Sequence, residues 1–71
     1  MSKASEAILD VLRDIKATPD QPIEIYAIGI PMVMERKFTE DEVYHALMWL
    51  QSDKVIELMD GNRLRLVKAI P

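Results

Sequence analysis

The chain contains no cysteine, so disulfides and thiolate-ligated metal sites are excluded. Its single histidine, His45, cannot hold a metal ion without carboxylate partners. The 71 residues leave room for one domain, expected to span residues 1–71. A chain this short buries only about 60% of its unfolded surface. Small domains without disulfides or metals often gain stability by oligomerisation, and a hydrophobic content of 49% favours the same solution here, a homodimer or a protein partner.

Long hydrophobic runs are also missing. No stretch approaches the ~20 apolar residues that cross a bilayer. The N-terminal segment MSKASEAILDVLRDIK places acidic residues inside its apolar stretch, which is not the pattern of a signal peptide. We therefore expect a cytoplasmic protein that does not enter a membrane.

Motifs for catalysis are scarce. With two glycines, the chain has no glycine-rich phosphate loop, and its one histidine has no serine–aspartate arrangement around it. The carboxylates lie on expected helix faces and helix starts, where solvation and the helix dipole account for them. The sequence therefore predicts no enzyme, no cofactor and no metal, and favours a binding or structural role.

Two long helices are predicted from apolar spacing and capping residues. In the first, Ser2 or Ser5 is the cap and Pro19 marks the end, because the residue before proline avoids helical angles. In the other, residues 39–53, Thr39 is the cap and Glu42 completes a capping box. The apolar stripes expected to be buried are Ala4, Ile8, Val11, Leu12 and Ile15 in the first helix, and Val43, Ala46, Leu47 and Leu50 in the other.

The segment between these helices is predicted as a short strand followed by a short helix. Residues 23–26 alternate isoleucine with polar or aromatic residues and lie between Pro22 and Gly29, which favours a strand. Pro31 suits the first turn of a helix that reaches Lys37. Gly29 and Pro31 together disfavour an unbroken helix from residue 24 to residue 37.

The C-terminal segment is predicted as a β-hairpin. Ile56 and Leu58 share one face and must meet Leu64 and Leu66, which requires a loop with an odd number of residues. A three-residue loop over residues 59–61, with Gly61 left-handed, satisfies this condition. The expected pairs are Leu58 with Asn62, Ile56 with Leu64, and Glu57 with Arg63.

The order of helix, strand, helix, helix, strand and strand resembles that of winged-helix domains, from about Ala4 to Val67. The stretch VYHALMWLQSDKVIEL, followed by GNRLRLV, is similar to a recognition helix running into its wing. The resemblance implies an α+β fold with three helices, a short strand and a C-terminal hairpin wing. It also implies a small DNA-binding regulator of transcription. Lys54 stands where the family often has glycine between helix and wing.

DNA contact through the wing and the second helix would use basic side chains. The candidates are Arg36, Lys37, Arg63, Arg65 and Lys68. The alternative is that the charges on the last strand only protect a solvated strand edge. The whole chain has a net charge of 9 − 12 = −3, and acidic residues Glu40, Asp41 and Glu42 open the expected recognition helix. These charges argue against that helix entering a DNA groove.

Protein interaction is the competing hypothesis. Opposite the buried stripe of the third helix lies a second set, Asp41, His45, Met48, Trp49 and Ser52. Tryptophan and methionine are enriched at interface centres, so this set predicts a surface for dimerisation or partner docking. In the alternative, Trp49 and Met48 are core residues covered by the hairpin, by Tyr26 or by the chain ends.

Overall fold

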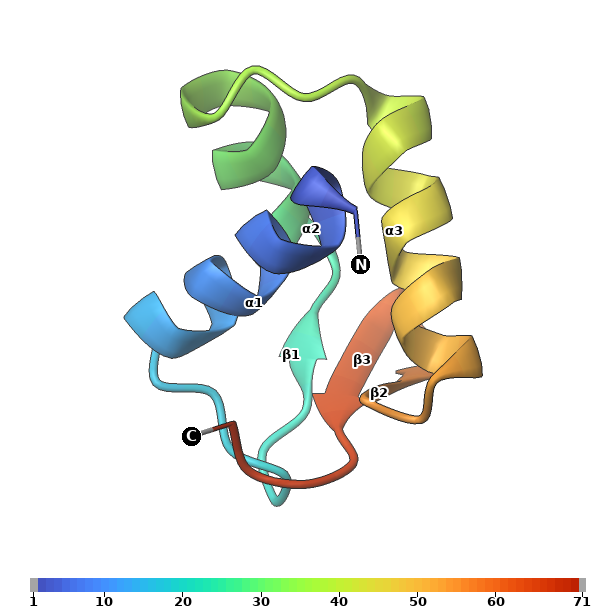
Figure 1. The fold of residues 1–71 in the computed structure, drawn as a ribbon. Coiled ribbons are helices and arrows are strands. Elements are labelled where there is room, and N and C mark those ends of the chain that lie inside the picture. The colour runs from blue at the N-terminus through green and yellow to red at the C-terminus, as the bar shows by residue number, and fades with distance from the viewer. Residues whose placement is uncertain (1, 71) are drawn as a thin grey trace.

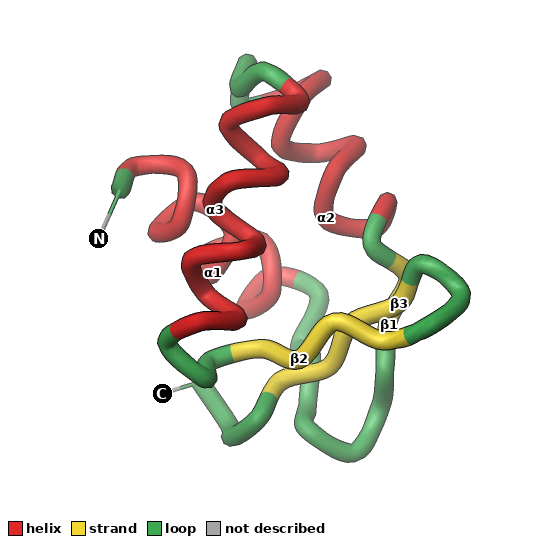
Figure 2. Tube along the Cα trace, turned by 90° about the vertical axis from the view of Figure 1, so that its right-hand side faces the viewer, coloured by secondary structure: helices red, strands yellow, loops and turns green. Residues whose placement is uncertain are grey.

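The computed structural model describes residues 2–70 and has three helical segments packed over a small antiparallel sheet (Figure 1; Figure 2). The elements follow the expected order and confirm an α+β protein. They are α1 (Lys3–Asp14), β1 (Ile23–Glu24), α2 (Tyr26–Ile30), η1 (Pro31–Glu35), α3 (Glu40–Ser52), β2 (Ile56–Met59) and β3 (Arg63–Leu66).

Both long helices begin at the predicted caps. The Ser2 side chain accepts a hydrogen bond from the Ser5 backbone N–H at 3.1 Å. At α3, the Thr39 hydroxyl accepts from the Glu42 N–H at 3.1 Å, and the Glu42 carboxylate accepts from the Thr39 N–H at 2.9 Å. This reciprocal pair satisfies two backbone donors that would otherwise lack partners at the helix start.

Lysines in left-handed conformation end all three helical segments. Lys16, Lys37 and Lys54 have φ of 58°, 65° and 61°. In α1 the next residue, Ala17, donates back to the Leu12 carbonyl at 3.0 Å, the bond of a Schellman cap. The first helix therefore ends at Asp14, well before Pro19, and Ile15 is left 44% exposed rather than buried as expected.

The segment after β1 differs from its prediction. The strand stops at Glu24, and residues 26–35 are helical, as a short α-helix that continues into the π-helical η1. Gly29 and Pro31 lie inside this helix. Pro31 has φ of −60°, which suits a helix, and the turn widens so that the Arg36 N–H bonds to the Pro31 carbonyl at 3.0 Å. A short helix beginning at Pro31 is confirmed, although it ends at Glu35 rather than Lys37. The strand predicted over residues 25–29 is wrong, because a π turn accommodates a proline that an uninterrupted α-helical ladder resists.

The hairpin has the expected faces in a different register. β3 is the central strand, between β1 and β2. The observed partners are Ile56 with Leu66, Leu58 with Leu64, Glu57 with Arg65, and Met59 with Arg63. The loop is residues 60–62, where Gly61 and Asn62 are both left-handed, with φ of 80° and 57°. Asparagine tolerates this conformation better than most residues, so the turn forms one position later than predicted. The shift of two residues preserves which side chains face the core.

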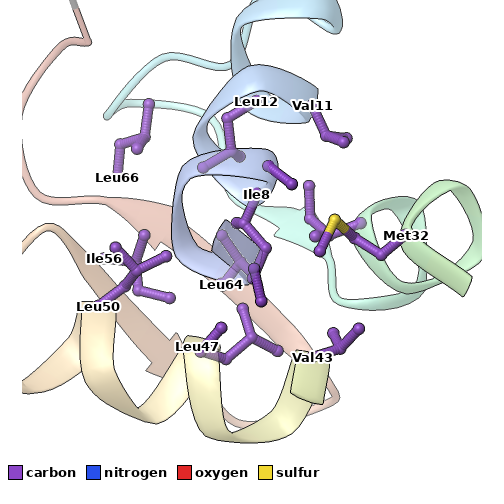
Figure 3. Packing of buried hydrophobic residues seen from close by; sticks show 14 residues of the cluster. Ile8, Val11, Leu12, Met32, Val43, Leu47, Leu50, Ile56, Leu64 and Leu66 are labelled. Atoms are coloured by element: carbon purple, nitrogen blue, oxygen red, sulfur yellow. The ribbon is translucent and has the colours of Figure 1, made fainter. Parts of the chain in front are cut away.

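The core is one cluster of fourteen buried apolar side chains drawn from helices and sheet. Figure 3 shows Ile8 and Leu12 of α1 pointing toward the same interior as Leu47 and Leu50 of α3. The sheet contributes Ile56, Leu64 and Leu66, and the second helical segment contributes Ile28 and Met32. The four apolar residues predicted as the buried stripe of α3 are all buried.

Candidate functional site

A groove of about 510 Å³ lies between the second helical segment and α3. Figure 2 shows α2 beside α3, with the hairpin turn close to the start of α2. The Ile25 N–H donates to the Asn62 carbonyl at 2.8 Å and fixes that turn against the helix start. The lining residues are Ile25, Tyr26, Gly29, Ile30, Val33 and Met34 on one side, Glu40, Val43, Tyr44 and Leu47 on α3, and Asn62 at the turn.

Four large side chains along this groove, here called the groove quartet, are more than half exposed. They are Tyr26 at 56%, Ile30 at 57%, Met34 at 67% and Tyr44 at 60%. Tyr26, Ile30 and Met34 follow one another at four-residue spacing, which places them on one side of the helical segment. Ile28 and Met32 of the same segment are fully buried. The segment therefore presents apolar side chains both to the core and to solvent.

Acidic residues occupy the ends of the groove. Glu40, the first residue of α3, is the only charged side chain that lines the groove among residues 2–70. At the hairpin end, a hydrogen bond to Glu24 and the negative charge of that carboxylate raise the pKa of Tyr26 above its ordinary value of 10.0, with a smaller contribution from burial. The groove is thus apolar along its length with a carboxylate at or beside each end.

A second, smaller hollow of about 360 Å³ lies on another side of α3, against the start of α1. Trp49 lines it and is 50% exposed, so it is not a buried core residue. Of the predicted interface set, His45 also lines this hollow, whereas Asp41 and Ser52 are exposed elsewhere on α3 and Met48 is half-buried. The hollow is also lined by the apolar side chain of Phe38 and by one charge of each sign, Lys3 and Glu42.

The basic residues predicted to contact DNA do not form one free patch. Arg36 reaches back to α1, with guanidinium nitrogens 3.6 Å from both the Asp10 and Asp14 carboxylates. Arg65 is paired with Glu57 at 2.7 Å across the hairpin. Two of the five cations therefore have carboxylate partners within 4 Å, in surface pairs that solvent screens.

The remaining three, Lys37, Arg63 and Lys68, are exposed on different parts of the chain. Arg63 lies opposite Glu24 in the sheet. Arg63 has strand partners on both sides, whereas Arg65 pairs only with Glu57 of β2 and its other side has no strand partner among the described residues.

Residues 2–70 show no candidate metal site. No group of three or more histidine, cysteine, aspartate or glutamate side chains is placed to hold a metal ion there. His45 makes an edge-on ring contact with Tyr44, with centroids 5.8 Å apart. Within the same part of the chain, none of the helices has the length and apolar character needed to span a bilayer.

The groove quartet could not be predicted from the sequence because the pattern of residues 23–29 favours a strand. In a strand, Tyr26 and Ile30 would share a face with Ile28, whereas in the helix Ile28 is buried and Tyr26 and Ile30 are exposed. The signal was nevertheless present, since Tyr26, Ile30 and Met34 have helical spacing. Tyr44 sits in the predicted third helix and was assigned to neither face.

Comparison with other proteins gave no match, whether the chain was compared with family models, with curated proteins or with solved structures.

Proposed function

We propose that this chain is a protein-interaction module with a winged-helix arrangement, and that its groove binds a helical segment of another protein. The observation that carries the proposal is the groove quartet, four large exposed apolar side chains lining one hollow. A groove between two helices is a common receptor for the apolar face of an amphipathic helix.

The composition of the groove supports a macromolecular helix as its occupant. Tyr26 and Tyr44 combine a large apolar ring with a hydroxyl, a residue type enriched among the dominant contacts of interfaces. Met34 is flexible and adapts to irregular partner surfaces. The π turn in η1 widens the helix beside Val33 and Met34, and such turns occur often at functional sites.

DNA binding through the wing and the second helix has weaker support. Arg36 and Arg65 already have carboxylate partners, and the free cations are separated. A DNA-binding surface gains its affinity from several cations that neutralise phosphates together.

A homodimer through the Trp49 hollow is a second candidate, favoured by its charges. Lys3 and Glu42 both line this hollow. In a symmetric dimer each residue type of one copy meets its counterpart on the other, so a hollow with both signs can complement itself.

The test of the groove is an unbiased selection. A displayed library of conformationally constrained helical peptides is selected on the intact chain, and the bound site is mapped by amide chemical-shift changes. We expect the selected peptides to carry apolar residues at positions i, i+3 or i+4, and i+7. We also expect the chemical-shift changes to occur at the amides of the groove quartet.

Matched variants make the selection decisive. Ile30→Glu places a charge in the groove at an exposed position and should abolish binding without unfolding the chain. Trp49→Glu makes the same change at the other hollow and should leave binding intact. Winners that still bind Ile30→Glu, or that map to another surface, would overturn the proposed function.

A further inference from the structure

The charges around the groove restrict the kind of helix it accepts. Glu40 lines one end, with Asp41 next to it on α3. At the hairpin end, Glu24 directly precedes the lining residues Ile25 and Tyr26 in the chain. No lysine or arginine is among the residues that line the groove in the described chain.

This arrangement disfavours a second copy of the chain as the occupant. Each copy has a net charge of −3. An antiparallel pairing of two grooves would bring Glu40 of one copy toward the Glu24 end of the other, and a parallel pairing would bring like ends together. Both geometries oppose carboxylates in a partly desolvated space, where like charges repel most strongly.

We infer that the groove is specific for a basic amphipathic helix, with apolar residues in its middle and lysine or arginine at both ends. The inference rests on the proposed function and adds the chemical class of the partner. The apolar middle covers the groove quartet, while the terminal cations lie near Glu40 and Glu24. Arg63, which is opposite Glu24 in the sheet, reduces the negative charge at the hairpin end, so Glu40 should dominate the preference.

Three designed peptides test this inference. They share one apolar helical face and differ only at the flanking positions, which are all lysine, all glutamine or all glutamate. Binding to the intact chain is measured by fluorescence anisotropy at low and physiological salt. We expect the lysine peptide to bind about tenfold more tightly than the glutamine peptide, with the difference shrinking as salt screens the contacts.

Charge variants of the chain locate the source of the preference. Glu40→Gln, and more weakly Glu24→Gln, should reduce the advantage of the lysine peptide. Glu6→Gln removes the same charge from an exposed position in the first turn of α1 and serves as the matched control.

Each outcome separates the two proposals. If the glutamine peptide binds and the lysine peptide binds no better, the charge preference is wrong and the groove function stands. If Glu6→Gln lowers the preference as much as Glu40→Gln, the overall charge is responsible and the inference fails. If none of the three peptides shifts the amides of the groove quartet, the proposed function itself is overturned.

Discussion

Tyr26 lines the groove two residues after Glu24 of β1, whose carboxylate shifts its ionisation. Its ring is exposed along the groove, and the hydrogen bond to Glu24 raises the pKa of its hydroxyl. Because Tyr26 is exposed and solvent screens its interaction with Glu24, the raised pKa corresponds to only a small stabilisation of the fold at pH below the ordinary pKa of 10.0. That contribution is lost as pH rises through the raised pKa, because a tyrosinate can no longer donate to a carboxylate.

Glu24→Gln should return the pKa of Tyr26 toward its ordinary value, since the neutral amide removes the largest causes of the shift. Ultraviolet titration of tyrosinate measures this change, and Tyr26→Phe identifies which transition belongs to Tyr26. An unchanged transition in Glu24→Gln would show that burial, rather than the carboxylate, sets the pKa.

Lys54 holds a backbone conformation that suits glycine. Its φ of 61° at the end of α3 costs a residue with a Cβ about 1–2 kcal/mol. Glycine adopts that conformation freely but loses about 0.5–1 kcal/mol through its greater freedom in the unfolded chain.

Lys54→Gly should therefore raise the free energy of unfolding by roughly 0.5–1 kcal/mol, the difference between these effects. Urea denaturation measures it. Lys54→Ala removes the same charge and keeps the Cβ, so it should give no gain. Equal stability of the two variants would mean that the left-handed conformation is not strained.

At the scale of elements, the sequence predicted those parts of the fold that depend on local chemistry. The capping box of Thr39 and Glu42 and the buried stripe of α3 both formed as expected, because capping and apolar spacing act within one helix. The hairpin register was missed because it depends on which residues of the turn become left-handed, and Asn62 does so beside Gly61.

Tertiary packing decided the second helical segment. Ile28 and Met32 are fully buried against the other helices, and this burial outweighs the local preference of residues 23–30 for a strand. The groove depends on that same segment, so its residues could not be assigned before the segment was known to be helical. The set that includes Trp49 could be predicted from sequence because α3 has clear caps and apolar spacing, yet only Trp49 and His45 of that set line the hollow.

Gly29 offers a test of the helix that the sequence disfavoured. A Cβ built at this position meets nothing within 4 Å. Gly29→Ala should then stabilise the chain by about 0.5–1 kcal/mol, the difference in helix propensity between these residues.

The control is Gly61→Ala in the hairpin turn, where φ is +80° and a Cβ is strained. This change should destabilise the chain, so the two alanine substitutions are expected to have opposite signs in thermal or urea unfolding. Loss of stability in Gly29→Ala would show that residues 26–35 do not form the helix described.

The basic residues of the C-terminal hairpin and of the second helical segment provide the test that separates DNA binding from protein interaction. Because Arg65 is paired with Glu57 and Arg36 with two aspartates, we expect binding to mixed duplex DNA to be weaker than about 10⁻⁴ M at physiological salt, the weak end of non-specific binding. An NMR titration with duplex DNA measures it. Tight binding that falls steeply with salt and disappears in the double variant Arg63→Ala, Arg65→Ala would restore the DNA hypothesis.

For the molecule as a whole, α3 separates two apolar surfaces with different charge patterns. The groove has carboxylates at or beside its ends and no cation in its lining, whereas the Trp49 hollow has Lys3 and Glu42. A chain can therefore use one surface for a foreign partner and the other for its own copy. We expect the charge pattern of each surface, more than its apolar area, to determine which partner it binds.

Self-association should therefore depend on Trp49 and be independent of the groove. We expect the parent chain to be a dimer in sedimentation velocity at high concentration, and Trp49→Glu to be a folded monomer, because it replaces the apolar ring by a second carboxylate beside Glu42, which is costly to desolvate without a new cation. Ile30→Glu carries the same change in charge at a side chain of similar exposure and should remain dimeric. Circular dichroism of both variants checks that the helices persist. A parent that is monomeric at high concentration, or an Ile30→Glu variant that also dissociates, would contradict the assignment of the dimer to the Trp49 hollow.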